Sequence, residues 1–211
     1  MLIFSSMKSA RGFSIVELLV SLSIVILIGW LFLQPAGRNS GSSQRIKCVN
    51  NLKNLGLAVR IYADNSSGSR LSAAVTNLIT LTVADYFRAL ADELVTPRVL
   101  TCPADRRVLE STNFRSLSNR NISFFANVAV QQNDSAAFLF GDRNLKTNEV
   151  AVPSGGILIL APNLDIGWTK EMHNEMGNIT MSDGSVQQFS SERLKQALQK
   201  PALSTNRLLI P

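Results

Sequence analysis

Apolar residues form one long stretch near the start of the chain, from residue 13 to residue 33, in which Glu17 is the only charged side chain. A helix of about 20 residues is roughly 30 Å long, which matches the apolar core of a bilayer. No small-residue cleavage site of the kind that ends a secretory signal follows, because the next residues are Gln34-Pro35-Ala36-Gly37-Arg38. We therefore expect residues 13–33 to form a transmembrane helix that stays in the mature protein.

A second pattern lies between residues 44 and 63, where apolar side chains recur at steps of three or four. That spacing places them on one face of a helix, so we predict an amphipathic helix whose apolar face packs on a core. The predicted face consists of Ile46, Val49, Leu52, Leu55, Val59 and Tyr62. Residues 34–43, between the two helices, contain Pro35 and two glycines and are predicted to be either a kink or an ordinary linker.

Residues 64–211 are long enough to bury a core of their own. Asp183-Gly184 stands between two alternating runs, which is a strong signal for a hairpin because the tight turn needs positive φ. The predicted helices are 78–94 and 190–199, and the predicted strands are 121–128, 137–140, 155–160 and the hairpin of 178–189. The expected fold class is α+β, with a long N-terminal helical spine, first transmembrane and then amphipathic, packed on an antiparallel β-sheet head.

Glu17 is out of place in an apolar run. An acidic group in a membrane-spanning helix costs on the order of 3 kcal/mol by insertion scales. No Lys, Arg or His between residues 13 and 33 could pair with it. Either its partner comes from another chain, a new amine or the lipid interface, or Glu17 lies near enough to the helix end to reach water.

The sequence around this carboxylate, residues 8–20, resembles the cleavage and methylation signature of type IV prepilins. In that family a short basic leader ends in Gly, an aromatic residue follows, and Glu is the fifth mature residue. The resemblance implies a leader of residues 1–12, cleavage between Gly12 and Phe13 by a prepilin peptidase, and N-methylation of Phe13. It also implies that Glu17 pairs with the new α-amine of a neighbouring subunit. Either Met1 or Met7 could be the start, and the mature product would be the same.

Partners and a location follow from the same resemblance. The partners are the prepilin peptidase and N-methyltransferase, other pilin or pseudopilin subunits, an inner-membrane assembly platform and the membrane itself. The chain would be a single-pass protein of the cytoplasmic (inner) membrane with its N-terminus inside and a pilin-like head, residues 64–211, outside the cytoplasm, and would then enter a filament. Basic residues flank the apolar run almost equally, so the positive-inside rule does not fix this orientation.

Two further segments resemble a particular prepilin-like subfamily. One is the run of residues 47–58, and the other is His173, nine intervening residues, and Asp183-Gly184, the H-X9-DG motif of that group. For Asp183-Gly184 we expect a turn. For His173 we expect a hydrogen bond that ties the preceding loop to the hairpin.

Cys48 and Cys102 are the only two cysteines, too few for a disulfide scaffold and too far apart for a zinc knuckle. In a head outside the cytoplasm they could form a bridge that clamps the spine to the head. The alternative is a pair of buried free thiols.

Composition narrows the function further. The net charge of +6 is spread along the chain rather than gathered in a stripe, so we expect no nucleic-acid binding. With a single histidine and neither a G-x-S-x-G nor an H-E-x-x-H motif, we expect no enzyme and no catalytic residues. We expect no metal or cofactor, although Asp142, Asp165 and Asp183 are oxygen donors of the kind that calcium binds.

The sequence thus predicts a structural subunit that is processed after Gly12 and assembles into a type II secretion pseudopilus or a type IV pilus. The alternative is a membrane-tethered extracytoplasmic binding module, a receptor or adhesin, that does not polymerise.

Overall fold

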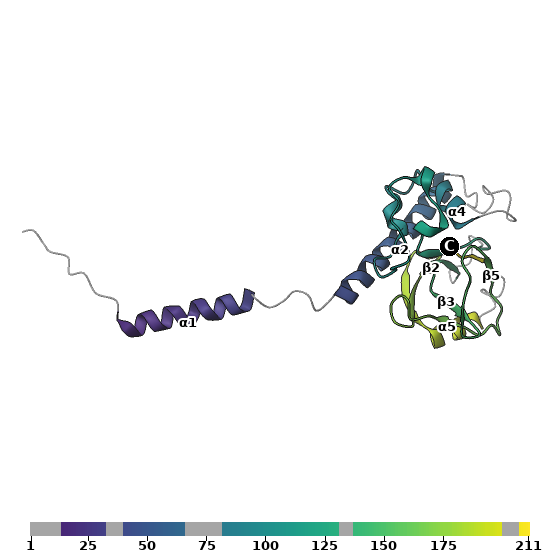
Figure 1. Cartoon of the computed structure of the whole chain (residues 1–211). Coiled ribbons are helices and arrows are strands. Elements are labelled where there is room, and N and C mark those ends of the chain that lie inside the picture. Colours follow the sequence, from purple (N-terminus) through teal and green to yellow (C-terminus); the bar gives the residue numbers. More distant parts are fainter. Residues whose placement is uncertain (1–13, 33–39, 66–81, 131–136, 200–206) are drawn as a thin grey trace, which may run out of the picture. The chain divides into compact units, whose positions relative to one another are not determined.

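The computed structural model describes residues 14–32, 40–65, 82–130, 137–199 and 207–211. The chain divides into two units, with the boundary between Asn39 and Ser40. Helix α1 belongs to the first unit, and the other elements belong to the second, Ser40–Pro211 (Figure 1). From here on we call this second unit the head, so the head now includes residues 40–63, which the sequence placed in the linker and the spine.

Helix α1 spans Ile15–Phe32, and residues 13 and 33 of the apolar run lie outside the described residues. Its 18 residues correspond to about 27 Å at 1.5 Å per residue. In the parts of the chain that the structure describes, no helix combines the length and apolar character needed to span a membrane. The prediction that the first half of the spine is a transmembrane helix is therefore wrong. The prediction of a single-pass membrane protein with its N-terminus inside is wrong for the same reason.

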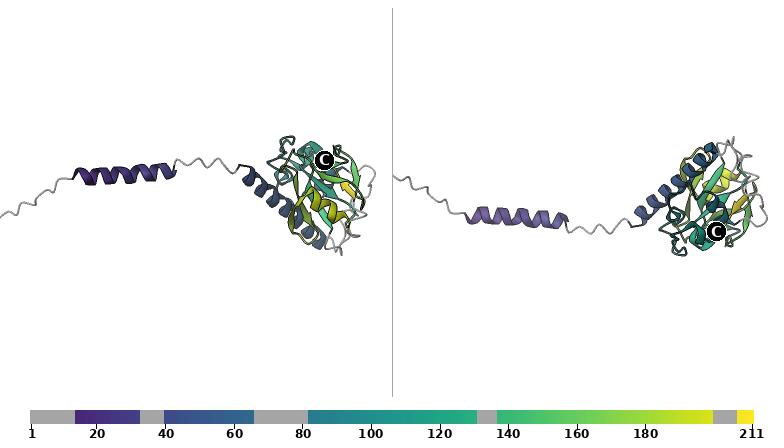
Figure 2. Two further views of the ribbon diagram at one scale, coloured as in Figure 1. Left: turned by 90° about the horizontal axis from the view of Figure 1, so that it is seen from below. Right: turned by 90° about the horizontal axis from the view of Figure 1, so that it is seen from above.

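Helix α2 spans Ser40–Asn65 and lies along one flank of the β-structure (Figures 1 and 2). It includes the last residues of the predicted linker 34–43, while residues 33–39 lie outside the described residues. The buried face is centred on Cys48, Leu52, Leu55 and Ala58, whereas Ile46 is 59% exposed. Leu52 and Leu55 belong to both the predicted and the observed face. Cys48 and Ala58 were left out of the prediction because they are small.

A close approach fixes α2 against the sheet. The hydroxyl of Thr180 donates a hydrogen bond of 3.2 Å to the carbonyl oxygen of Leu52 in α2. A Cβ on Gly56 would lie 2.9 Å from Thr180 Cγ2, so the residue at this position must be small for the helix and strand to come this close.

The main sheet has six strands in the order β5-β9-β1-β2-β7-β8, and every neighbouring pair is antiparallel. The hairpin of β7 and β8 is where the sequence predicts it, and Gly184 in its turn has φ +85°. The strands are β1 Phe124–Asn127, β2 Phe138–Asp142, β5 Ile157–Ile159, β7 Met176–Met181, β8 Val186–Ser190 and β9 Arg207–Leu209. The α+β arrangement with an antiparallel sheet is thus present without the transmembrane part.

A second sheet of three short strands, in the order β4-β3-β6, was not predicted. Its strands are β3 Leu145–Thr147, β4 Val150–Ala151 and β6 Ile166–Trp168. Asn148 and Glu149 join β3 to β4 with φ of 48° and 62°. Positive φ at both positions is typical of the tightest hairpin turns, but the usual Asn-Gly or Asp-Gly signal is absent from this sequence.

Two short helices flank the main sheet. Helix α4 spans Val83–Ala89 and begins with a capping box in which Thr82 and Asp85 satisfy each other's backbone amides. Helix α5 spans Ser191–Leu198 and is capped by Ser190. Helix α4 ends at Ala89, whereas the sequence predicted a helix that continues to residue 94. Residues 78–81, at the start of that predicted helix, lie outside the described residues. Short 3-10 helices are η2 Pro97–Leu100, η3 Phe114–Ser116 and η4 Asn119–Asn121.

Both faces of the main sheet are buried. On one face, Phe124 and Phe140 pack with side chains of α2 and α4. On the other, Phe125 and Phe138 pack with Trp168 and with the apolar face of α5. The strand β1 is therefore apolar at successive positions, as expected for a strand covered on both sides.

Candidate functional site

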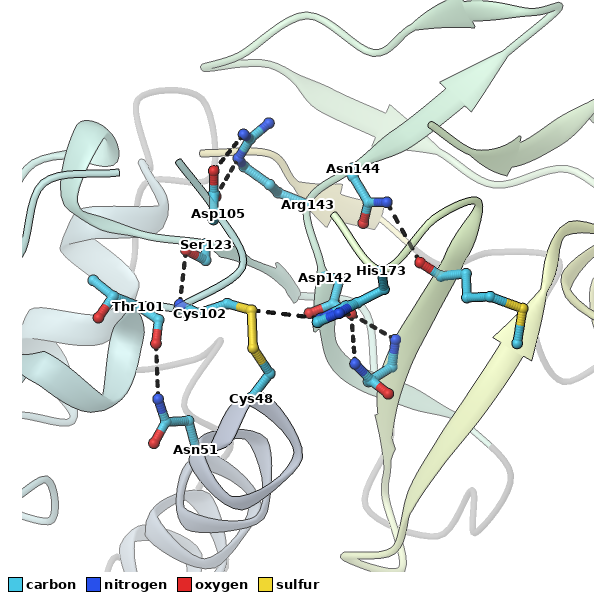
Figure 3. Close-up of a disulfide and its surroundings, with 12 residues drawn as sticks. Cys48, Asn51, Thr101, Cys102, Asp105, Ser123, Asp142, Arg143, Asn144 and His173 are labelled. Carbon is cyan, nitrogen blue, oxygen red and sulfur yellow. Dashed lines mark hydrogen bonds and ion pairs between the residues drawn. A yellow bond between two sulfur atoms is a disulfide. The ribbon is translucent and has the colours of Figure 1, made fainter. Parts of the chain in front are cut away.

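A group of four chemically active side chains from different parts of the sequence comes together in the head. Cys48 comes from the first half of α2, and Cys102 follows the 3-10 helix η2. Asp142 ends β2, and His173 lies in the segment between β6 and β7 (Figure 3). We call Cys48, Cys102, Asp142 and His173 the bridge cluster.

Cys48 and Cys102 form a disulfide across a sequence separation of 54, with Cα atoms 4.9 Å apart. Of the two alternatives left open by the sequence, the structure has the bridge. Both residues are buried, and the backbone amide of Cys102 donates a hydrogen bond of 2.9 Å to Ser123 Oγ. One turn along α2, Asn51 donates from Nδ2 to the carbonyl oxygen of Thr101 at 2.7 Å. The bridge therefore joins α2 to the segment that leads into the sheet.

His173 lies directly over the bridge. Its Nε2 is 3.4 Å from Cys102 Sγ and 3.5 Å from Asp142 Oδ2. The backbone holds it there through three successive residues with positive φ, namely 31° at His173, 53° at Asn174 and 59° at Glu175. Arg45 of α2 donates a hydrogen bond of 2.9 Å to the carbonyl oxygen of His173, which anchors this strained segment.

Asp142 is fully buried, and its Oδ2 accepts hydrogen bonds from the backbone amide of Asn178 at 2.7 Å and from Asn178 Nδ2 at 2.8 Å. Within the described residues, its Oδ1 has no hydrogen-bond partner. Burial raises the pKa of Asp142 to about 7, against the lowering effect of the Asn178 donors. Burial, together with the charge of Arg45, lowers the pKa of His173 to about 4. At neutral pH the imidazole is therefore neutral, and its contact with Asp142 is polar rather than a full ion pair.

The described contacts of His173 differ from the expected hydrogen bond to the hairpin, because its ring lies against Cys102 and Asp142 and its carbonyl oxygen accepts from Arg45. Its ring contacts Asp142 on β2, and Asp142 in turn accepts from Asn178 on β7, the first strand of the hairpin. Asp183, the other end of the H-X9-DG motif, accepts from the backbone amide of Ser185 at 2.8 Å within the turn. The motif therefore supplies two separate structural features rather than one joint site.

A buried ion pair borders the bridge cluster. Arg143 follows Asp142 and binds Asp105, which lies three residues after Cys102. Arg143 also contacts Glu171 Oε2 at 2.9 Å. The sequence did not predict that Asp105 and Arg143 pair, because they lie 38 residues apart in the chain.

The processing residues Gly12 and Phe13 lie outside the described residues. Glu17 has a partner in its own chain, because its Oε2 accepts from the backbone amide of Ser14 at 3.1 Å. In return, Ser14 Oγ accepts from the amide of Val16 at 3.4 Å. Ser14 and Glu17 thus cap the start of α1 in the manner of an S-x-x-E capping box, a signal that was present in the sequence but was not used.

The three aspartates considered for calcium have separate partners. Asp142 accepts from Asn178, Asp165 pairs with Lys195 Nζ at 2.6 Å, and Asp183 accepts from its own turn. In the described residues, the group whose ligand atoms come together is Cys48, Cys102 and His173, all within 4.8 Å of one another. While the two sulfurs are bonded to each other, this group acts as a cross-link.

No known protein family, no curated protein and no solved structure matches this chain.

Proposed function

We propose that this chain is a prepilin-like structural subunit that is processed after Gly12 and polymerises through helix α1 into a type II secretion pseudopilus or a type IV pilus. The observation that carries the proposal is the exposure of large apolar side chains on all sides of α1. Partners in this proposal are a prepilin peptidase, an assembly platform and sibling subunits.

The second half of helix α1, from Ile24 to Phe32, has no charged or hydroxyl-bearing side chain, whereas Glu17, Ser21 and Ser23 lie in its first half. The residues from Ile24 to Ile28 are more than one helical turn, and each of them is at least half exposed. A helix that is apolar all round is normally buried on all sides. The exposed residues are Ile15, Val16, Leu18, Leu19, Val20, Leu22, Ile24, Val25, Ile26, Leu27, Ile28 and Trp30.

Packing between copies of α1 would remove this surface from water. Burying one Leu, Ile or Val side chain contributes about 1.5–3 kcal/mol, so several such side chains at each contact provide a strong drive to associate. The same helix from other subunits is a suitable neighbour because its sides are equally apolar. The exposed apolar surface is thus the assembly surface in this proposal.

The construction of the head suits a subunit under mechanical load. The disulfide, the Thr180–Leu52 hydrogen bond and the buried face of α2 tie this helix to the sheet at several points. A pull on the N-terminal end of α2 would therefore be carried to the segment after η2 by a covalent bond and to the sheet by packing and a hydrogen bond.

Processing is tested by mass spectrometry of the chain isolated from its native cells. The expected N-terminal peptide begins at N-methyl-Phe13. A mature protein that still carries residues 1–12 would overturn the processing step.

Polymerisation is tested by two substitutions at Glu17. Glu17→Gln keeps an oxygen that can accept from the Ser14 amide but removes the charge, whereas Glu17→Ala removes both. Because the proposal assigns the charge to the new amine of a neighbouring subunit, we expect filaments to be lost with both variants. Glu110→Gln, at an exposed carboxylate of the head, is the control and should assemble normally. Normal filament yield with Glu17→Gln would contradict the proposal.

A further inference from the structure

We propose that reduction of the Cys48–Cys102 disulfide turns the bridge cluster into a closed site for one zinc ion. Cys48, Cys102 and His173, whose ligand atoms lie within 4.8 Å of one another, would be three of its ligands, and Asp142, whose carboxylate would have to turn toward the ion, would be the fourth. This inference concerns the head alone and does not depend on the proposed polymerisation.

The distances already resemble the edges of a tetrahedral zinc site. With zinc–sulfur bonds of about 2.3 Å and zinc–nitrogen or zinc–oxygen bonds of about 2.0–2.2 Å, a sulfur and a nitrogen are separated by roughly 3.6 Å and a nitrogen and an oxygen by roughly 3.4 Å. The structure has 3.4 Å between Cys102 Sγ and His173 Nε2, and 3.5 Å between His173 Nε2 and Asp142 Oδ2. The sulfur–nitrogen edge therefore fits before any movement, and the carboxylate of Asp142 lies beside the same nitrogen.

The sulfurs must separate for the ion to enter. Reduction by a dithiol breaks the S–S bond, as two electrons and two protons pass from the dithiol to the cysteines and the dithiol becomes a disulfide. In a tetrahedral site the two sulfurs are about 3.8 Å apart. Rotation about the Cα–Cβ bond of either cysteine would move its sulfur away from the other. Each thiol then loses its proton when it binds the ion.

The surroundings of the cluster suit a bound cation. Asp142 has a buried Oδ1 without a hydrogen-bond partner in the described part of the chain, while two donors of Asn178 orient the carboxylate through Oδ2. Such outer contacts normally fix the ligands of metal sites. Two thiolates and one carboxylate carry three negative charges against the two positive charges of zinc, and Arg45, whose charge acts on both Asp142 and His173, balances the remainder.

The ligand set also selects the ion. Thiolate sulfur and imidazole nitrogen favour zinc over magnesium or calcium, and four protein ligands in a buried place leave no open position for water or substrate. All four residues are at most 8% exposed. The site is therefore structural, and it would replace the cross-link by a metal bridge between α2 and the sheet.

Cobalt titration tests the proposal because Co²⁺ reports its own ligands. The full chain is treated with a phosphine reductant and titrated with Co²⁺, and the oxidised chain is titrated in parallel. We expect thiolate-to-cobalt charge transfer and the intense visible bands of a tetrahedral ion at one equivalent, in the reduced chain alone, and displacement by one equivalent of Zn²⁺. Absence of these bands, or equal bands in the oxidised chain, would overturn the proposal.

Single substitutions then identify the ligands. His173→Ala and Asp142→Asn should each weaken Co²⁺ binding at least tenfold and shift the visible bands, because each alters a ligand. Asp165→Asn is the matched control, since Asp165 pairs with Lys195 instead, and it should bind like the native chain. Unchanged spectra for His173→Ala would show a site without the imidazole and would overturn the assignment.

A folding measurement covers the case in which reduction loosens the head. If circular dichroism shows loss of structure on reduction, Zn²⁺ should restore it in the native chain and fail to restore it in His173→Ala, because a metal site forms only with the fold. Failure of Zn²⁺ to restore the native chain would also overturn the proposal.

Discussion

Arg143 binds both carboxylate oxygens of Asp105, from Nε to Oδ2 at 2.6 Å and from Nη2 to Oδ1 at 2.7 Å. The two side chains are only 7% and 1% exposed, so this is a buried bidentate ion pair. It connects the end of β2 with the segment that follows Cys102.

Replacing Asp105 with Asn should destabilise the head by about 3–5 kcal/mol, because it leaves a buried guanidinium without its full counter-charge. The loss is measured from the midpoint of urea unfolding. Glu110→Gln serves as the control, since Glu110 pairs with Arg98 at 3.7 Å on the surface and should change the stability by less than about 1 kcal/mol. Equal effects of the two substitutions would contradict the importance of the buried pair.

The pH dependence of stability should reveal two opposing groups in the bridge cluster of the oxidised chain, measured with a chelator present. The pKa of Asp142 is raised by burial to about 7, so its folded form binds more protons than the unfolded chain between about pH 4 and 7. Its contribution to stability therefore falls as the pH rises through that range. The pKa of His173 is lowered by burial and by Arg45 to about 4, so its contribution rises between about pH 4 and 6.5.

Two variants separate the contributions of Asp142 and His173 to the pH dependence of stability. Asp142→Asn leaves the histidine, so its stability relative to the native chain should rise with pH from about 4 to 6.5. His173→Asn leaves the carboxyl and tolerates the positive φ, so its relative stability should fall over the same range. Slopes of the same sign from urea unfolding at a series of pH values would contradict the two pKa shifts.

Gly177 is predicted to be a position where even a methyl group is too large. A Cβ there would overlap the indole ring of Trp168, which is fully buried. Gly177→Ala should cost about 1–3 kcal/mol or more and disturb the tryptophan fluorescence, because the core must shift to make room. Gly156→Ala is the matched control, since a Cβ at that position meets no described atom within 4 Å, and its effect should stay within about 0.5 kcal/mol.

Helix α1 provides a test of assembly that is independent of Glu17. Ile26 is 62% exposed in the single chain, and the proposed filament buries it. Ile26→Lys should reduce the amount of sedimentable polymer at least tenfold, because the apolar gain of about 1.5–3 kcal/mol is lost and a charge must be buried instead. Ile26→Leu keeps the apolar surface and should assemble normally. Equal sedimentation of the two variants would exclude α1 as the assembly surface.

Local patterns predicted the elements with strong periodic or turn signals. The steps of three and four in α2, the Asp-Gly turn of the β7–β8 hairpin and the Ser190 cap of α5 depend on neighbours in sequence, and each element is present. The β3–β4 hairpin was missed because Asn148-Glu149 is not a usual pair for positive φ. Strands β6 and β9 have only three residues each, too few for an alternating pattern.

The site could not be predicted from the sequence, because it depends on contacts between residues that are far apart in the chain. The proximity of Cys102, Asp142 and His173 depends on the chain path between β6 and β7 and on the positive φ of His173, and neither follows from spacing. The role of Asp142 as acceptor for Asn178 likewise depends on the β2–β7 register. The transmembrane prediction for 13–33 relied on the apolar run as a whole, and no helix in the described part of the chain has the length and apolar character to span a membrane.

The covalent link between α2 and the segment after η2 has a consequence for proteolysis. Cys48 and Cys102 close a ring of chain, so a single cut anywhere between them leaves both fragments attached. A nicked molecule would migrate as one species without a reducing agent and as two with it, and its two halves would still be held together for refolding.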